Sequence, residues 1–212
     1  MVLLSKYRKK RPLNRQDDGK RDSTLVVIAT EGRCTEKHYF EMFRSSRVHI
    51  QVLETTDTHS SPKYVLQRLR RFEKEVDLGK GDILCLVLDV DRWPKVNLKR
   101  VCHDGQDRNY ILAISNPCFE VWLLSHFQDL GEGPGQETLC KAYEKKLRET
   151  LGHYNKSNLD VTQFSPENIH QAALRCQKAD INPTDRWPRE VGSHVYRIIE
   201  EFQKRGVKAH AK

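Results

Sequence analysis

Two short apolar runs constrain the fold of this chain more than any other feature. They are Leu25-Val26-Val27-Ile28-Ala29-Thr30 and Ile83-Leu84-Cys85-Leu86-Val87-Leu88. Runs of this length and composition are typical of strands that are buried inside a sheet. Strand patterns at 25–30, 48–54, 83–88 and 110–115 alternate with helical patterns at about 35–45 and 60–76, after Pro94, and from Asn116-Pro117 onward. This order predicts an α/β fold with a mostly parallel sheet flanked by helices.

The 212 residues are expected to form one domain, with an appended region at the carboxyl end. We predict a basic flexible arm at residues 1–24 and the α/β core at residues 25–128. A loop rich in glycine and proline at 129–136 breaks the pattern. Beyond it, helical patterns at about 137–150, 166–180 and 191–205 predict a helical region, residues 129–212, packed on the core.

The positive charge of the chain is concentrated in the arm. Of the formal net charge of +8, residues 1–24 supply +5, from eight Lys or Arg against three Asp. Such an arm is either a solubilising tail or a phosphate contact, and the second interpretation assigns Arg8, Lys9, Lys10 and Arg11 to nucleic-acid binding. A polyanionic partner fits this charge but is not required by it.

The remaining composition predicts a cytoplasmic protein without a membrane partner. No run approaches the length of a membrane span, and the apolar start at residues 1–4 is too short for a signal peptide. The six cysteines are widely scattered, as expected of reduced thiols, and contain no Cys-x-x-Cys pair. Any bound metal is therefore expected to have oxygen ligands.

Three acidic residues follow the apolar runs directly. Glu31 comes after the first run, and Asp89 and Asp91 come after the second. Each alone could be a helix cap or a solvated loop residue. Together they indicate a site, because residues at i and i+2 share a face while a strand stays extended, and because ligands bind at the carboxyl edge of such sheets. We predict that Asp89 and Asp91 bind Mg²⁺, or Mn²⁺ in its place, for phosphoryl-transfer chemistry, and that Glu31 is a third ligand or the general base.

Three local strings resemble the RloB family. They are Glu31-Gly32-Arg33-Cys34-Thr35-Glu36-Lys37-His38-Tyr39-Phe40, Leu88-Asp89-Val90-Asp91-Arg92, and Ser115-Asn116-Pro117-Cys118-Phe119-Glu120-Val121-Trp122-Leu123-Leu124. The last is the most specific, and the resemblance spans roughly residues 8–205, including Tyr154-x-Lys156. One departure is Val90, where family members often have a basic residue between the two carboxylates.

The resemblance implies a Toprim-like core and a phage-defence effector that works beside an ATPase. No Gly-x-x-x-x-Gly-Lys-Ser/Thr motif is present, so ATP hydrolysis would come from that partner. The leading hypothesis is a metal-dependent endonuclease acting on DNA or RNA, transfer RNA included. The alternatives are a non-catalytic subunit that binds nucleic acid or the ATPase, and a primase-like nucleotidyl transferase. Assembly into a homo-oligomer stays open.

Four further residues are candidates for the site. Glu36 either holds a second ion or caps the helix near Thr35, and Glu120 either joins the catalytic group or only meets its helix dipole. Arg92 and Lys156 either contact substrate phosphates or are solvated charges. Phe119, Trp122 and Leu123 are expected in the core.

Overall fold

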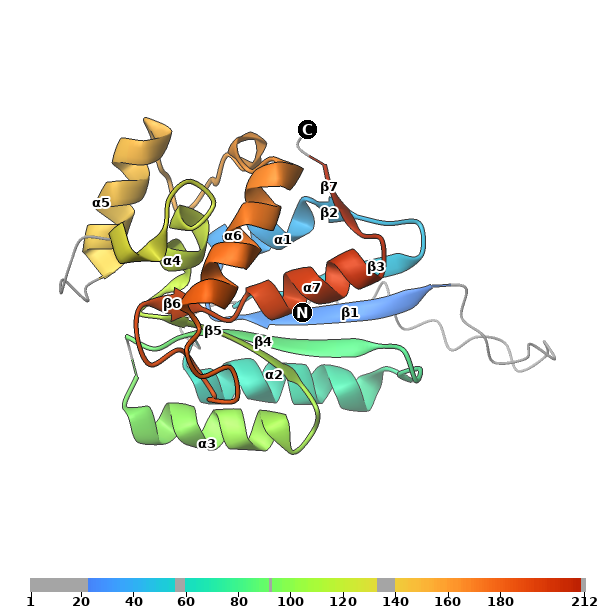
Figure 1. Ribbon diagram of the computed structural model, residues 1–212. Helices are drawn as coiled ribbons and strands as arrows, with labels where there is room; N and C mark the ends of the chain where they lie inside the picture. The colour runs from blue at the N-terminus through green and yellow to red at the C-terminus, as the bar shows by residue number, and fades with distance from the viewer. Residues whose placement is uncertain (1–22, 56–59, 92, 133–139, 211–212) are drawn as a thin grey trace.

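The four predicted strands form and lie side by side in one sheet (Figure 1). The computed structural model describes residues 23–55, 60–91, 93–132 and 140–210. The sheet has the order β3-β1-β4-β5-β6, in which the first four strands are parallel and β6 is antiparallel to β5. Its strands are β1 (Thr24–Thr30), β3 (Val48–Leu53), β4 (Ile83–Asp89), β5 (Ile111–Asn116) and β6 (Gly192–Ser193). The predicted α/β class with a mostly parallel sheet is confirmed.

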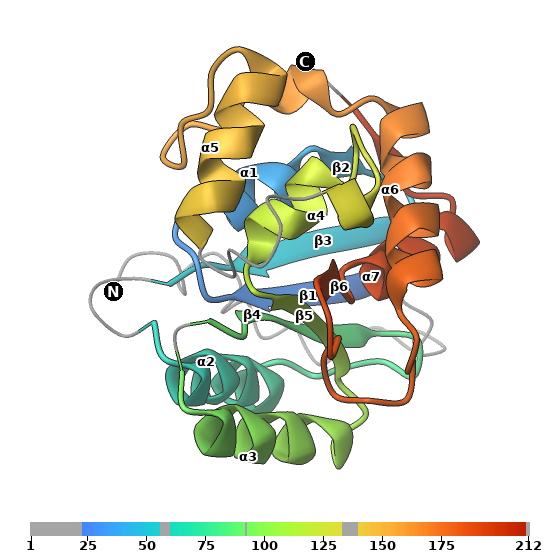
Figure 2. The same cartoon turned by 60° about the vertical axis from the view of Figure 1, so that its left-hand side comes forward.

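Helices cover both faces of this sheet (Figures 1 and 2). One face is covered by α2 (Pro62–Glu75) and α3 (Lys95–Gln106). The other is covered by α1 (Thr35–Glu41), α4 (Phe119–Leu124), α6 (Pro166–Ala179) and α7 (Tyr196–Lys204), while α5 (Cys140–Leu151) packs outside on α4. Two 3₁₀ turns, Leu130–Glu132 and Val161–Gln163, join helices of this second layer.

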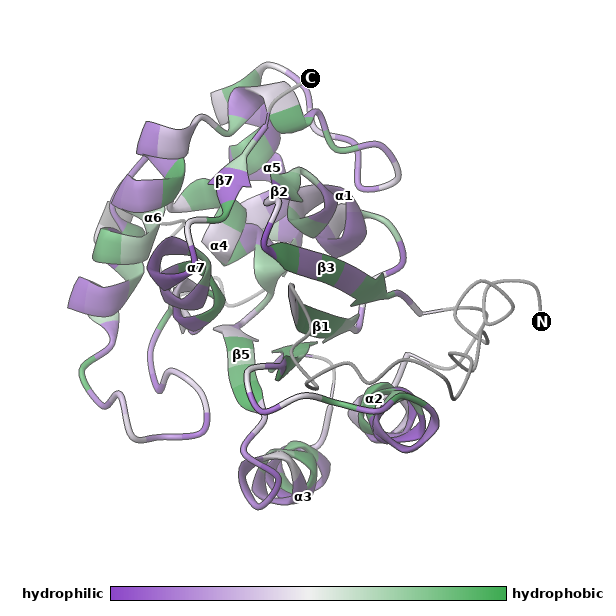
Figure 3. Ribbon diagram, turned by 90° about the vertical axis from the view of Figure 1, so that its right-hand side faces the viewer, coloured by the Kyte–Doolittle hydropathy of each residue, from purple (hydrophilic) through white to green (hydrophobic). Residues whose placement is uncertain are grey.

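The alternation of side chains along the strands explains the two layers. In β1, Val26 and Ile28 face the core under α1 and α4, whereas Val27 and Ala29 face the core under α2 and α3. Because both faces of the strand are buried, almost every residue of β1 is hydrophobic. Figure 3 shows the complementary pattern in the helices: α2 and α3 turn hydrophobic residues toward the sheet and hydrophilic residues away from it.

Two sequence predictions differ from the structure at the ends of helices. The first predicted helix stops at Glu41 and gives way to β2 (Phe43–Arg44), which pairs with β7 (Lys208–Ala209). The helix expected over 191–205 begins only at Tyr196, because Gly192–Ser193 pair with the end of β5 instead. A hydrogen bond of 2.8 Å between the Ser115 and Ser193 hydroxyls reinforces this pairing. The carboxyl-terminal region therefore contributes a strand to the sheet as well as helices.

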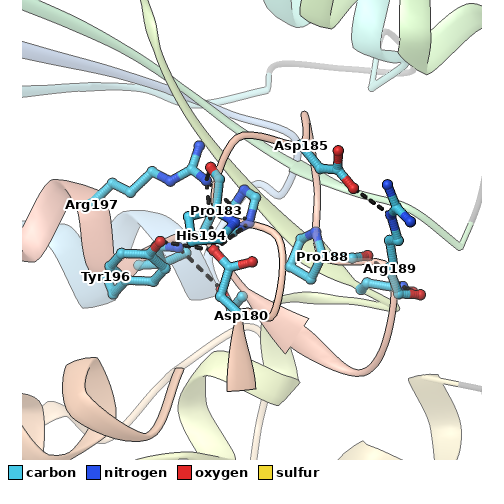
Figure 4. A network of polar contacts seen from close by, with 11 residues as sticks. Asp180, Pro183, Asp185, Pro188, Arg189, His194, Tyr196 and Arg197 are labelled. Atoms are coloured by element: carbon cyan, nitrogen blue, oxygen red, sulfur yellow. Dashed lines mark hydrogen bonds and ion pairs between the residues drawn. The ribbon is translucent and has the colours of Figure 1, made fainter. Parts of the chain in front are cut away.

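A network of polar contacts anchors the segment between α6 and β6 (Figure 4). Asp180 accepts a hydrogen bond of 2.8 Å from the Tyr196 hydroxyl and lies 3.0 Å from His194 Nε2. Arg197 donates to the Pro183 carbonyl at 2.7 Å. From the sheet, Asn116 donates to the Pro188 carbonyl at 2.9 Å. The segment is thereby fastened to the carboxyl end of β5.

A buried histidine just beyond the end of α4 is neutral. His126 Nδ1 lies 2.9 Å from the Trp122 carbonyl, which can only accept, so Nδ1 bears the proton. Its Nε2 then accepts from the Tyr39 hydroxyl at 3.0 Å. Burial lowers the pKa of His126 to about 3. His126 and Tyr39 are thus packing residues.

Among the described residues, no helix combines the length and the apolar character needed to cross a membrane.

Candidate acidic active site

A cavity of about 490 Å³ opens at the carboxyl edge of the sheet. It lies where β1 and β4 end and where α1 and α4 begin. Four carboxylates reach it from separate elements, together with one lysine and one arginine. The lining residues are Glu31, Gly32, Arg33, Cys34, Thr35, Glu36, Asp89, Phe119, Glu120, Lys156 and Ser157. The structure therefore brings together Glu31, Asp89, Glu36, Glu120 and Lys156, all of them predicted site residues.

Glu31 is held in place by contacts from β4 and the loop after it. It is the first residue after β1 and is 4 % exposed, and its backbone N–H donates to the Val87 carbonyl at 3.1 Å. Its Oε1 accepts from Trp93 Nε1 at 2.8 Å, and its Oε2 accepts from the Asp89 N–H at 3.3 Å. The sequence analysis did not predict this contact of Trp93. The indole orients the carboxylate without supplying positive charge.

Asp89, the last residue of β4, is the most strongly perturbed acid of the site. Asp89 is half-buried and lines the cavity. Burial raises the pKa of Asp89 well above its usual value, and the negative charges of Glu31, Glu36 and Glu120 raise it further. The crowding of these carboxylates therefore disfavours the ionised form of Asp89.

Glu36 lies on the first turn of α1 and closes the loop that follows β1. Its Oε1 accepts from the Gly32 N–H at 2.9 Å, in the loop before α1, so this contact does not cap the helix. A Cβ at Gly32 would lie 1.9 Å from Glu36 Oε2, so only glycine lets the carboxylate approach the backbone this closely. Burial is the main cause of the raised pKa of Glu36, and the nearby Glu120 adds to it. Glu36 therefore combines a structural contact with a place in the cavity.

Glu120, on the first turn of α4, is paired with Lys156. Lys156 Nζ lies 2.8 Å from Glu120 Oε1 and 2.6 Å from Glu144 Oε1, and the Tyr154 hydroxyl donates to Glu120 Oε1 at 3.1 Å. Burial opposes ionisation of Lys156, but its two ion pairs outweigh burial and raise its pKa. Lys156 is thus half-exposed but ion-paired on both sides. The roles of Tyr154 and Glu144 were not predicted, although Tyr154 belongs to a string that the sequence resemblance had marked.

Asp91 lies apart from the cavity lining. The strand pairing ends at Asp89, and the Val90 and Asp91 N–H groups both bond to the Pro117 carbonyl, at 3.1 and 3.2 Å. The chain turns there, so the extended geometry that would place the two carboxylates on one face is lost. Asp91 is exposed, and its Oδ2 accepts from Cys140 Sγ at 2.8 Å. Its role as a ligand remains a prediction, while Arg92, Arg8, Lys9, Lys10 and Arg11 lie outside the described residues.

The chemistry of the cavity matches a hard divalent cation. Among the described residues, no three His, Cys, Asp or Glu side chains are arranged to hold a metal ion as they stand. The donors that line the cavity are carboxylate oxygens, which Mg²⁺ and Mn²⁺ prefer. Burial, together with the neighbouring acids, raises the pKa values of Asp89 and Glu36. The donor set therefore fits the ion by its chemistry, and the side chains would have to move to close around it.

Comparison with models of known protein families identifies the family of this chain. A model of the family described as RloB-like protein matches residues 26–202. The chain belongs to the RloB-like family. The matched region runs from β1 into α7 and contains every described residue that lines the cavity. No curated protein and no solved structure matches the chain. The resemblance drawn from the three sequence strings is confirmed.

Proposed function

We propose that this RloB-like protein is a magnesium-dependent nuclease that hydrolyses phosphodiester bonds. One observation supports the proposal above all: four carboxylates from separate elements converge on one cavity at the carboxyl edge of a mostly parallel sheet. Ligands bind at this edge in open α/β sheets. A cluster of desolvated acids is unfavourable for stability alone, and such clusters mark functional sites.

The residues would divide the work as follows. Glu31 and Asp89 would hold the cation, with Glu36 or Glu120 completing the oxygen set. A bound magnesium ion would neutralise phosphate charge and acidify a water molecule. Glu31 is pre-oriented by the Trp93 indole, which favours a fixed ligand geometry. Lys156 supplies positive charge beside the cavity, where a substrate phosphate would lie.

The same proposal includes a Toprim-like core and a role as a defence effector with an ATPase partner. Its basis is the membership of the RloB-like family and the absence of a phosphate-binding Gly-x-x-x-x-Gly-Lys-Ser/Thr loop in the sequence. ATP-dependent activation would then come from a second protein.

One feature of the site favours a competing function, that of a non-catalytic binding subunit. Glu31 and Glu120 already have hydrogen-bond or ion-pair partners within the protein. In a silent subunit these contacts would be the whole purpose of the cluster, and added metal would not alter stability or produce cleavage.

A cleavage assay separates these functions. Purified protein would be incubated with plasmid, single-stranded DNA and transfer RNA, in magnesium, manganese or chelator, with and without the neighbouring ATPase. We expect metal-dependent products from the wild type and none from Asp89→Asn, with Asp77→Asn as an exposed matched control. Absence of products in every condition would refute the nuclease and favour the silent subunit. Extension of a template with nucleoside triphosphates would instead indicate a nucleotidyl transferase.

A further inference from the structure

An acidic cavity repels the polyanion that a nuclease must bind, so attraction has to come from positive surface beside it. Helix α5 has such a surface. Its apolar side, Tyr143 and Leu147, is buried in the core, whereas Lys141, Lys145 and Arg148 are exposed on the opposite side. The helix is therefore amphipathic, with its solvent side basic.

The three cations form one line along the helix. Their spacing of four and then three residues places them within an arc of about 60° and over a length of about 10 Å, from the regular geometry of an α-helix. Within the described part of the chain, none of the three forms an ion pair. Glu144 on the same helix is occupied by Lys156, so among the acids of α5 only Glu149 lies beside the line without such a partner. We call Lys141, Lys145 and Arg148 the α5 stripe.

Helix α5, which carries the stripe, starts beside the elements that form the cavity. Cys140, the first residue of α5, contacts Asp91, and Glu144 one turn later contacts the cavity residue Lys156. Figure 1 shows α5 at the end of the molecule toward which the parallel strands point, and Figure 2 shows it beside α4. Since α4 supplies Glu120, the helix with the stripe packs directly on an element of the site.

We infer that the α5 stripe binds the phosphate backbone of nucleic acid and leads it to the cavity. This inference rests on the proposed function and adds to it the surface that holds the substrate. Backbone binding by a row of lysine and arginine is independent of sequence and depends steeply on salt. It also leaves the cavity free for the group that is cleaved.

Helix α3 is the rival surface. It too begins at the carboxyl edge, and Lys95, Lys99 and Arg100 are exposed on it. Only Lys95 and Lys99 fall on one line, because Arg100 is rotated by about 100° from Lys99. The neighbouring Val96 is 72 % exposed and interrupts the charge. We therefore expect α3 to contribute little.

The test compares three triple variants that remove the same charge. The stripe variant is K141Q/K145Q/R148Q, and the rival variant is K95Q/K99Q/R100Q. The control is R47Q/K74Q/K80Q, whose residues are exposed and lie near the opposite, amino edge of the sheet. Glutamine keeps helix propensity, and circular dichroism with thermal unfolding would verify the fold of each variant.

Binding is measured apart from cleavage, by anisotropy of labelled single-stranded DNA, single-stranded RNA and duplex DNA in chelator, from 50 to 500 mM KCl. If the stripe makes three phosphate contacts, its loss should lower the slope of log affinity against log salt by about 2 on a single strand. Affinity at 0.1 M salt should fall about 100-fold, while the control and α3 variants change less than about threefold.

Two results would overturn the inference: a stripe variant that binds as tightly as the control, or a loss confined to the α3 variant. A wild type that binds no nucleic acid would overturn it together with the proposed function. A wild type that binds nucleic acid through the stripe but never cleaves it would refute the proposed nuclease function and still support the binding surface.

Discussion

Replacing Asp89 by asparagine should make the protein more stable without metal and inactive with it. Asparagine keeps the shape of the side chain but removes one of the four charges that meet in the cavity. Because the folded-state pKa of Asp89 is raised, the unfolded chain loses this proton first as pH increases. The wild type is therefore destabilised as pH rises above about 4, and the asparagine variant lacks this contribution.

The size of the effect follows from linkage. Between the unfolded pKa near 3.9 and the raised folded pKa, stability falls by about 1.4 kcal/mol per pH unit for this group. At pH 5 the wild type should have lost about 1.5 kcal/mol that Asp89→Asn retains. Urea unfolding in chelator at pH 4, 5 and 6 measures the difference, and Asp77→Asn, an exposed site, should follow the wild type. A stability difference between the two proteins that stays constant with pH would refute the raised pKa of Asp89.

Magnesium should reverse the order of stability. An ion that binds only the folded wild type adds about 2.7 kcal/mol at one hundred times its dissociation constant, whereas the variant should gain far less. Cleavage should fall at least about 100-fold, which corresponds to about 3 kcal/mol of lost transition-state stabilisation. Full cleavage by Asp89→Asn would refute its assignment as a ligand.

Three other changes test contacts around the site and in the core. Gly32→Ala would place its Cβ against the Glu36 carboxylate, so cleavage should fall at least tenfold at a stability cost of about 1 kcal/mol, and full activity would contradict the role of Glu36. Trp93→Phe removes the hydrogen-bond donor to Glu31 and should reduce the rise in unfolding temperature that magnesium causes. An unchanged rise would show that the indole does not pre-orient the Glu31 carboxylate. His126, with its pKa lowered to about 3, should make the wild type lose about 1.4 kcal/mol per pH unit below pH 6.5. His126→Gln should lack that loss when its free energy of urea unfolding is compared at pH 7 and 5. The same pH dependence in the wild type and the variant would show that the histidine is not buried and neutral.

The sheet could be predicted from the sequence because its strands have a strong local signal. β1 and β4 are buried on both faces and are therefore apolar throughout, which separates them from the amphipathic helices around them. The pairing of Gly192–Ser193 with β5 could not be predicted in this way. A two-residue strand has no periodicity, and it forms because of the Ser115 hydroxyl and the backbone at the end of β5.

The site was predictable to the extent that it depends on topology. Glu31 and Asp89 meet because β1 and β4 are adjacent parallel strands that end at the same edge. Asp91 differs because its place depends on a turn whose hydrogen bonds go to Pro117, a residue more than twenty positions away in sequence. The partner of Lys156 likewise comes from tertiary packing of α4 against the segment after α5.

The charges in the cavity explain why a bound cation would stabilise the cluster of carboxylates. Lys156 offsets the charge of Glu120 and Glu144, whereas neither Glu36 nor Asp89 forms an ion pair within the described part of the chain. The protein could relieve this repulsion by protonating Asp89, as its raised pKa indicates, but only by giving up an anionic ligand. A divalent ion would relieve it while keeping all the oxygens charged. Stability in the absence of metal is thus lowered at the very residues that the proposed chemistry needs, which is the pattern expected where function and folding compete.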